Sequence, residues 1–503
     1  MPPPPRLRNR VQQAFRPTAD HLARRVVHGA AFTFLGIALR TGVTVASMAV
    51  LARLLRPADF GHLAMATVVT ELAAVFSNFG FGSILIQRPR VSRIQIDTMH
   101  WSAAGLGLTL TTLVFVLSYL SGHFFQNAMV GPLLRVLCLC FILEELTMVP
   151  RSLLARRMQF KLDFLIQAAT QLSRVATAIV MALQGMGVWS LVAGALAGSV
   201  VQACAYWALS GYWPRPRFSR SFLRSTWRTN GGHFGNGILF FINSNLDLFL
   251  VGRRLGAALL GQYQNARSLT DEIRSRMVQP LQRVLFPAFS AIQNDTDRFR
   301  EGILRSGRLL ALAFIPMGLG VAAVAPELVR VLYGDQWLPM IPILQVIAIA
   351  TGLSAPYSIS SPIFNATNRV GLSFRLFLAS TLITIALMLY GSQWGLMGVA
   401  WSRLALAGVG LVFFRISLGL VGMRTRHIWQ IMGPPSIAAG AMWWLIGLLR
   451  DWVQSQVTSN ASAQLGCLIG LGAAAYLSAS LVLSAQHMRD ARVAVSKLRG
   501  ESK

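Results

Sequence analysis

Apolar stretches of roughly 20 residues recur along the whole chain, and short polar or glycine-containing segments separate them. An α-helix needs about 20 consecutive apolar residues to cross the hydrocarbon core of a bilayer. The pattern therefore predicts an all-α polytopic membrane protein with about 14 transmembrane helices. The predicted spans are 28–53, 61–86, 99–121, 127–149, 162–184, 187–210, 232–253, 260–290, 304–332, 339–364, 371–391, 393–419, 430–449 and 463–486.

The segment 251–272 resembles the segment 51–72, and the two align without a gap. A second similarity, between PLLRVL at 132–137 and PILQVI at 342–347, lies at nearly the same displacement. Duplication of a unit leaves such matches, whereas chance similarity in an Ala-, Leu- and Gly-rich composition is the alternative. The matched pairs are Arg53 and Arg253, Leu55 and Leu255, Ala58 and Ala258, Gly61 and Gly261, Ala66 and Ala266, Thr70 and Thr270, and Glu71 and Asp271.

Six predicted helices separate each similar segment from its copy, so the two copies run in the same direction through the membrane. This predicts two parallel six-helix halves related by an axis along the membrane normal. The halves are residues 28–210 and 232–419, joined by a cytoplasmic loop at 211–231. The remaining parts are a basic interfacial tail at 1–27, two additional transmembrane helices at 430–486, and a basic cytoplasmic tail at 487–503.

The chain is strongly basic, with 46 Lys and Arg residues against 18 Asp and Glu and a formal net charge of +28. In a soluble protein such a charge would suggest nucleic acid as a partner. With the tail 1–27 in the cytoplasm, however, most basic residues fall in inner loops, as the positive-inside rule requires. We therefore expect both termini in the cytoplasm, an attraction to membrane lipids, and no nucleic-acid partner. The predicted outer loops carry little positive charge beyond Arg53, Arg56, Arg253, Arg254 and Arg450.

Enzyme signatures are missing from the sequence. The only lysines are Lys161, Lys497 and Lys503, and none ends a glycine-rich phosphate loop. The chain has no zinc-type His/Glu spacing and no nucleophile elbow, and its predicted outer loops are too short to hold a catalytic domain. We expect a protein that is not an enzyme, with no catalytic residue, metal or cofactor.

Arginines inside predicted spans are candidates for binding an anion. Arg40 lies halfway along the first span, and the span 260–290 contains further arginines. Ionisable groups at this depth usually face a protein interior or a wet cavity, and guanidinium groups suit a diphosphate through paired hydrogen bonds. The alternative is structural pairing or a cytoplasm-facing helix. The candidates for a diphosphate and sugar site are Arg40, Arg267, Arg274, Arg276 and Arg283.

Carboxylates in the same spans are candidates for coupling to an ion or proton gradient. Glu71 and Asp271 occupy matched positions of the two similar segments, and Asp247 lies in the span before Asp271. A desolvated carboxylate can bind a proton near neutral pH. The alternative is that each one neutralises a nearby arginine, as the four-residue spacing of Arg267 and Asp271 allows. Glu144 and Glu145 are a further pair, expected at a solvated helix end.

Several ordered segments resemble the polysaccharide transporters of the MOP flippase superfamily, with the closest likeness to Wzx-type exporters of the colanic-acid kind. The likeness covers residues 30–420, and its clearest marks are Asp247 in NLDLFLVG and an expected turn, LGQY, at Gly261. The segments are LARLLRPADFGHLAMATVVTEL, FGFGSILIQR, NLDLFLVGRRLGAALLGQYQNA, LFPAFSAIQND and APELVRVLYGDQWLPMIPILQVIAI.

This resemblance implies a flippase that moves undecaprenyl-diphosphate-linked oligosaccharide between leaflets of a bacterial inner membrane, for exopolysaccharide, O-antigen or capsule biosynthesis. It implies alternating access of two halves around a cationic cavity, driven by an ion or proton gradient. A polysaccharide polymerase or other export machinery is the implied protein partner. An oligosaccharide needs such a carrier, because each sugar hydroxyl would lose its hydrogen bonds in the hydrocarbon core of the bilayer.

Two other functions compete with this one. A drug or cation antiporter of the same superfamily is disfavoured by the arginines of the span 260–290, which would repel a cationic drug. A membrane glycosyltransferase or polysaccharide polymerase would need acidic residues in a substantial outer loop. Asp59 is the only early candidate, and its predicted loop is very short.

Overall fold

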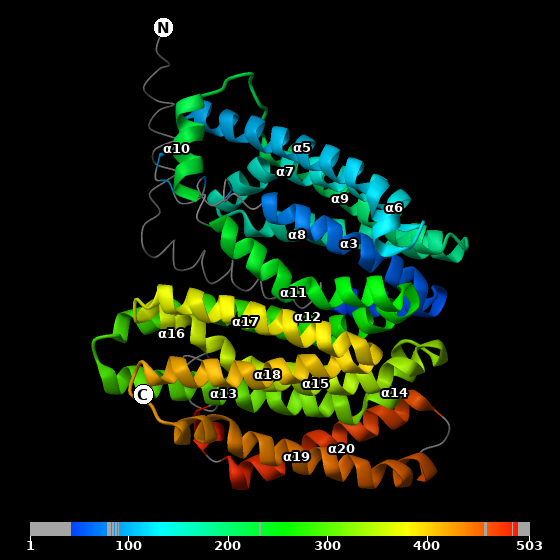
Figure 1. The fold of residues 1–503 in the computed structure, drawn as a ribbon, viewed down its shortest axis with the longest axis vertical. Coiled ribbons are helices and arrows are strands. Elements are labelled where there is room, and N and C mark those ends of the chain that lie inside the picture. Colours follow the sequence, from blue (N-terminus) through cyan, green and yellow to red (C-terminus); the bar gives the residue numbers. More distant parts are fainter. Residues whose placement is uncertain are drawn as a thin grey trace. The chain divides into compact units, whose positions relative to one another are not determined.

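The computed structural model describes residues 42–77, 82, 85, 88, 90–230, 233–456, 460–484 and 486–490 (Figure 1). The regular secondary structure of these residues is entirely helical. Nine stretches of the described chain are long and apolar enough to cross a membrane, and two of them, Asp335–Ala366 and Val370–Gly419, contain more than one helix. The prediction of an all-α polytopic membrane protein is confirmed, whereas the number of 14 spans is not established.

The helices before residue 231 follow the predicted apolar stretches, except that the helix Arg220–Asn230 lies in the predicted loop 211–231. The structure divides the predicted span 127–149 into two helices that meet at Cys138. The elements in order are a helix at Gly42–Leu54, α3 (Pro57–Ser77), α5 (Arg93–Phe125), α6 (Val130–Leu137), α7 (Leu139–Arg156), α8 (Phe160–Leu183), α9 (Val188–Ser210) and α10 (Arg220–Asn230).

The later helices also follow the predicted spans, and two of the breaks between them lie beside a proline. Pro326 and Pro356 stand near the starts of α14 and η2, where a residue without a backbone N–H is tolerated. The elements are α11 (His233–Leu255), α12 (Ala257–Ile292), α13 (Thr296–Ala323), α14 (Ala325–Leu332), η1 (Asp335–Met340), α15 (Ile341–Ser354), η2 (Ala355–Ile359), α16 (Ser360–Ala366), α17 (Val370–Gly391), η3 (Ser392–Trp394), α18 (Gly395–Gly419), α19 (Thr425–Gln456) and α20 (Ala461–Leu483).

The break between α11 and α12 lies at Gly256, which has a φ of 86° that favours glycine. The LGQY segment at Gly261, which the sequence analysis expects to be a turn, is instead part of α12. The expectation was wrong because Gly256 alone makes the turn, and the residues after it already have helical periodicity. As a result, Asp247 on α11 and the arginines on α12 belong to two consecutive helices.

Contacts divide the chain into two units. The first contains Met1–Ser47, Ala73–Tyr119 and Pro132–Phe234. The second contains Met48–Leu72, Leu120–Gly131 and Gly235–Lys503. The segment Met48–Leu72, which lies in the first half proposed from the sequence, has most of its contacts within the second unit.

In the first unit, α7, α8 and α9 pack against one another. Small residues allow α8 and α9 to approach closely, since a Cβ added at Gly194 would lie 2.6 Å from the carbonyl oxygen of Arg174. In the second unit, α13 packs against α15 and α19, and α18 packs against α15 and α17 (Figure 1). The core of the second unit is built from the apolar faces of these helices, with Phe299, Ile315 and Phe414 at most 1% exposed.

The two similar segments found in the sequence contact each other within the second unit. A Cβ added at Gly61 of α3 would lie 1.7 Å from the carbonyl oxygen of Ala257, and one added at Gly261 of α12 would lie 1.8 Å from that of Pro57. The contact is reciprocal, because Gly61 and Pro57 align with Gly261 and Ala257. Duplication of one ancestral helix would produce this arrangement, and the two parallel six-helix halves stay a prediction.

Candidate functional site

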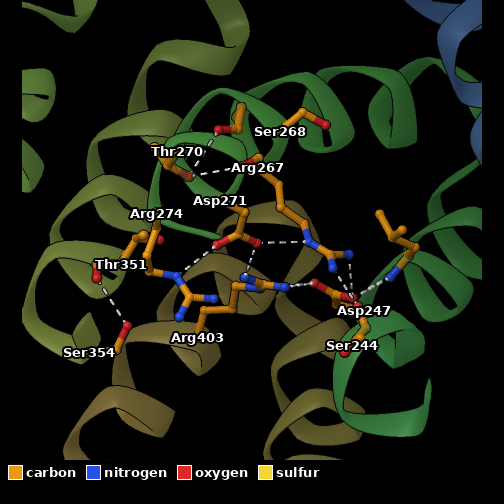
Figure 2. A network of polar contacts seen from close by, with 12 residues as sticks. Ser244, Asp247, Arg267, Ser268, Thr270, Asp271, Arg274, Thr351, Ser354 and Arg403 are labelled. Atoms are coloured by element: carbon orange, nitrogen blue, oxygen red, sulfur yellow. Dashed lines mark hydrogen bonds and ion pairs between the residues drawn. The ribbon is translucent and has the colours of Figure 1, made fainter. Parts of the chain in front are cut away.

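The second unit contains a network of charged side chains centred on Asp247 (Figure 2). Asp247 lies on α11 and is only 2% exposed. Its Oδ2 accepts a hydrogen bond from the hydroxyl of Tyr263 at 2.7 Å, and its Oδ1 accepts one from the backbone N–H of Leu248 at 2.9 Å. A buried carboxylate is stable only when such donors and a counter-charge replace its hydration.

Two arginines supply the counter-charge, and both of them contact a second aspartate. Arg267 of α12 lies 3.2 Å from Asp247 and 3.2 Å from Asp271, four residues further along α12. Arg403 of α18 lies 2.7 Å from Asp247 and 3.2 Å from Asp271. The two guanidinium groups therefore bridge the same two carboxylates, and they connect α11, α12 and α18.

Arg274 stands at the more open side of the network. Its side chain is 33% exposed, and its Nε lies 3.7 Å from Oδ1 of Asp271, too far for a hydrogen bond. Asp271 is 24% exposed and thus contacts three guanidinium groups. Three arginines face two aspartates, so this part of the second unit carries an excess of positive charge.

The structure brings together four of the residues proposed from the sequence, namely Asp247, Arg267, Asp271 and Arg274 (Figure 2). Glu71 lies on α3 with its side chain exposed, and no ion pair involves it among the described residues. Arg40 lies outside the described residues, as do the side chains of Arg276 and Arg283 on α12. The binding or coupling roles of these residues stay predictions.

Sequence reasoning missed two members of the network, Arg403 and Tyr263. Arg403 is the ninth residue of α18, and the 25 residues of this helix are otherwise apolar or small except for Arg415 near its end. The depth criterion that selected Arg40 would also have selected Arg403. Tyr263 had no such signal, because a tyrosine in an apolar helix is usually part of the core.

Such a network has two chemical properties. The interior part, around Asp247, is fully compensated and can fix the relative positions of three helices. At the outer part, a carboxylate already sits among three guanidinium groups, in the position that a bound phosphate oxygen would prefer. The site can therefore bind an anion if some of the arginine N–H groups that contact Asp271 contact the anion as well.

Comparisons with known proteins point to one family. A family model described as "Polysaccharide biosynthesis protein" matches residues 50–342. The chain is 27% identical to the lipopolysaccharide biosynthesis protein WzxC of Escherichia coli (strain K12), over 74% of this chain and 76% of the relative. It is 26% identical to the succinoglycan biosynthesis transport protein ExoT of Rhizobium meliloti (strain 1021), over 78% and 81% of the two chains.

Solved structures share the fold at low sequence identity. The lipid II flippase MurJ, in an inward closed conformation, is similar with a TM-score of 0.73 and 15% identity, over 92% of this chain and all of that one. An inward-facing multidrug resistance transporter of the MATE family, in the MOP superfamily, gives a TM-score of 0.60 and 15% identity, over 76% and 95%. At this identity the likeness shows the fold alone.

Proposed function

Because the chain belongs to the polysaccharide biosynthesis protein family, we propose that it is a flippase that carries lipid-linked oligosaccharides across a membrane. It is a multi-pass membrane transporter and not an enzyme. We place it in the inner membrane of a bacterium, with undecaprenyl-diphosphate as the lipid carrier and alternating access as the mechanism. A polysaccharide polymerase or export machinery is its proposed protein partner.

The observation that carries the proposal is the cationic network of the second unit. A flippase for this substrate must hold a diphosphate away from bulk water, and arginines bind phosphate oxygens through charge-assisted hydrogen bonds. Asp271 marks the position of an anion among Arg267, Arg274 and Arg403. We assign Arg274 the first contact with the diphosphate, because it is the most exposed of the three and has the longest ion pair.

The multidrug alternative fits this network less well. The fold is compatible with it, since a multidrug transporter shares the architecture. A cationic drug, however, would be repelled where three arginines face two aspartates. No observation in the described residues favours the glycosyltransferase or polymerase alternative.

A reconstituted transport assay tests the proposal. Full-length protein is placed in liposomes with a fluorescent undecaprenyl-diphosphate-linked disaccharide, and the fraction accessible to a membrane-impermeant quencher is followed over time. The wild type should accelerate movement between leaflets. Arg274→Gln should slow it by about tenfold, the equivalent of one lost charge-assisted hydrogen bond.

Arg298→Gln is the matched control, because Arg298 of α13 is 80% exposed and its ion pair is with Asp295 at the start of the same helix. This variant should transport at the wild-type rate. A normal rate in Arg274→Gln would remove Arg274 from the site. A wild type that does not accelerate movement, or that makes new glycosidic bonds, would contradict the function itself.

A further inference from the structure

The first unit contains a buried carboxyl group that the anion site does not use. Glu145 of α7 is 7% exposed. One oxygen of its carboxyl group accepts a hydrogen bond from the hydroxyl of Ser77, at the end of α3. On another side it packs against Gly107 of α5, where an added Cβ would lie 2.9 Å from the Cβ of Glu145. Three helices therefore enclose this side chain, which the sequence analysis expects at a solvated helix end.

Glu145 differs from every other buried acid of the described residues in lacking an arginine. Four buried acids have an arginine within 4 Å, and Glu145 has no ion pair in the part of the chain that the structure describes. The four are Asp97 with Arg93 at 3.8 Å, Asp247 with Arg403 at 2.7 Å, Glu327 with Arg450 at 3.1 Å and Asp490 with Arg308 at 3.2 Å. Among the described residues, buried negative charge is compensated at the other four acids but not at Glu145.

The depth of Glu145 makes ionisation costly. Its neighbour Gly107 is the fifteenth of the 33 residues of α5, and a helix of that length spans about 50 Å. Glu145 therefore lies beside the middle of a membrane-crossing helix. An ionised carboxylate buried there without a counter-charge is strongly unfavourable, whereas the neutral acid retains its hydrogen bond to Ser77.

The charged groups around Glu145 favour the same state. Its chain neighbour Glu144 is exposed, and Arg174 of α8 and Arg151 of α7 interact with it electrostatically. Whenever Glu144 is ionised, its negative charge, one residue away, opposes a second negative charge on Glu145. The charged residues of α5 lie near its two ends, and α9, which also packs on α7, contains no charged residue.

We propose that Glu145 is a proton-binding site and that the proton it carries couples transport to a pH gradient. The second part rests on the proposed flippase function. In the conformation described, the carboxyl group is closed between α3, α5 and α7 and holds its proton. A conformation that admits water to this place stabilises the carboxylate and releases the proton. Protonation therefore shifts the equilibrium between the two conformations, as a ligand with different affinities for them does.

Infrared spectroscopy tests the proton site without any transport. Full-length protein in lipid is titrated between acidic and alkaline pH, and the carbonyl band of protonated carboxylic acids is recorded. The wild type should retain a protonated carboxyl near neutral pH, and Glu145→Gln should lose that band. Glu144→Gln, its matched control, should keep the band. A band unchanged in Glu145→Gln, or one that disappears in Glu144→Gln alone, would overturn the proposal.

A transport measurement tests the coupling separately. In liposomes with an imposed pH gradient, the wild type should move the fluorescent lipid-linked disaccharide faster than without a gradient. Glu145→Gln should show the same rate with and without it. If Glu145→Gln does not fold, Glu145→Asp should keep the band with a shifted midpoint, and Ser77→Ala should shift the midpoint as well. If Glu145→Gln transports the lipid and its rate still responds to the gradient, the coupling is refuted. The flippase function is then unaffected.

Discussion

Asp247 is the residue on which the charge network of the second unit most depends. It binds Arg267 and Arg403 while being almost completely buried. Asp247→Asn should lower the free energy of unfolding by about 3 kcal/mol, because removing one partner of a buried ion pair leaves uncompensated charge. Thermal unfolding of the purified protein in detergent, with tryptophan fluorescence as the signal, measures this loss.

The matched control is Asp297→Asn, since Asp297 is 95% exposed and lies 3.7 Å from Arg300. Its unfolding temperature should equal that of the wild type. The double variant Asp247→Asn/Arg403→Gln should recover part of the loss, because it removes positive charge together with negative. If the double variant lost as much stability as the sum of the losses in Asp247→Asn and Arg403→Gln, the pair would not be coupled.

At the residue scale, sequence reasoning succeeds where partners are close along the helix. The spacing of Arg267 and Asp271 predicts that they can meet, and they lie 3.2 Å apart. It fails for Arg403, which reaches Asp247 across 156 residues of chain, because local spacing carries no information on such contacts. The adjacent glutamates of α7 differ in burial for a similar reason. Glu144 is exposed and Glu145 is buried, and only the packing of α3 and α5 decides which.

At the scale of helices, the apolar pattern predicts nearly every element, and boundaries differ where proline or glycine divides a stretch. The predicted span 304–332, for example, becomes α13 and α14, with a break at Val324. A hydropathy pattern records the total apolar length but not the backbone donor that Pro326 lacks. The contact of α3 with α12 also could not be predicted from the pattern, although the alignment of Gly61 with Gly261 shows which residues are equivalent.

The substitution of glycine by alanine should have opposite effects at Gly61, where α3 closely approaches α12, and at Gly408, which lies away from this contact. Gly61→Ala places a methyl group against the backbone of Ala257, and the separation of the helices should cost about 1–3 kcal/mol. Gly408→Ala is the control, since no atom lies within 4 Å of a Cβ added there on α18. It should raise the free energy of unfolding by up to about 1 kcal/mol, because alanine loses less entropy in a helix.

Unfolding of both variants in the same detergent gives the comparison. Gly261→Ala should behave as Gly61→Ala does, because the contact is reciprocal. If Gly61→Ala and Gly261→Ala were as stable as Gly408→Ala, the helices would not depend on the close contact. The test thus also measures whether the two similar segments are equivalent in their contribution to stability.

For the whole molecule, neither the fold nor the net charge identifies the substrate. The fold is shared by transporters of unlike cargo, so it does not select a substrate. The positive-inside rule predicts that most of the net charge of +28 lies in cytoplasmic loops, because arginines near helix ends are retained in the cytoplasm. We propose that selection of an anionic lipid substrate instead depends on a few arginines at helix interiors, which contribute little to the total charge.

Orientation is the property of the whole chain that the positive-inside rule predicts, and reporter fusions can measure it. Alkaline phosphatase fused after Ser392, between α17 and α18, should be active, because this short segment without Lys or Arg is predicted to face outward. The same enzyme fused after Arg424, beside Arg426, should be inactive, and a green fluorescent protein at the C-terminus should fluoresce. An active phosphatase after Arg424 together with a dark C-terminal fusion would invert the topology. Inversion would place the tail 1–27 outside. Its arginines would then contradict the positive-inside rule, from which the cytoplasmic location of the basic residues is predicted.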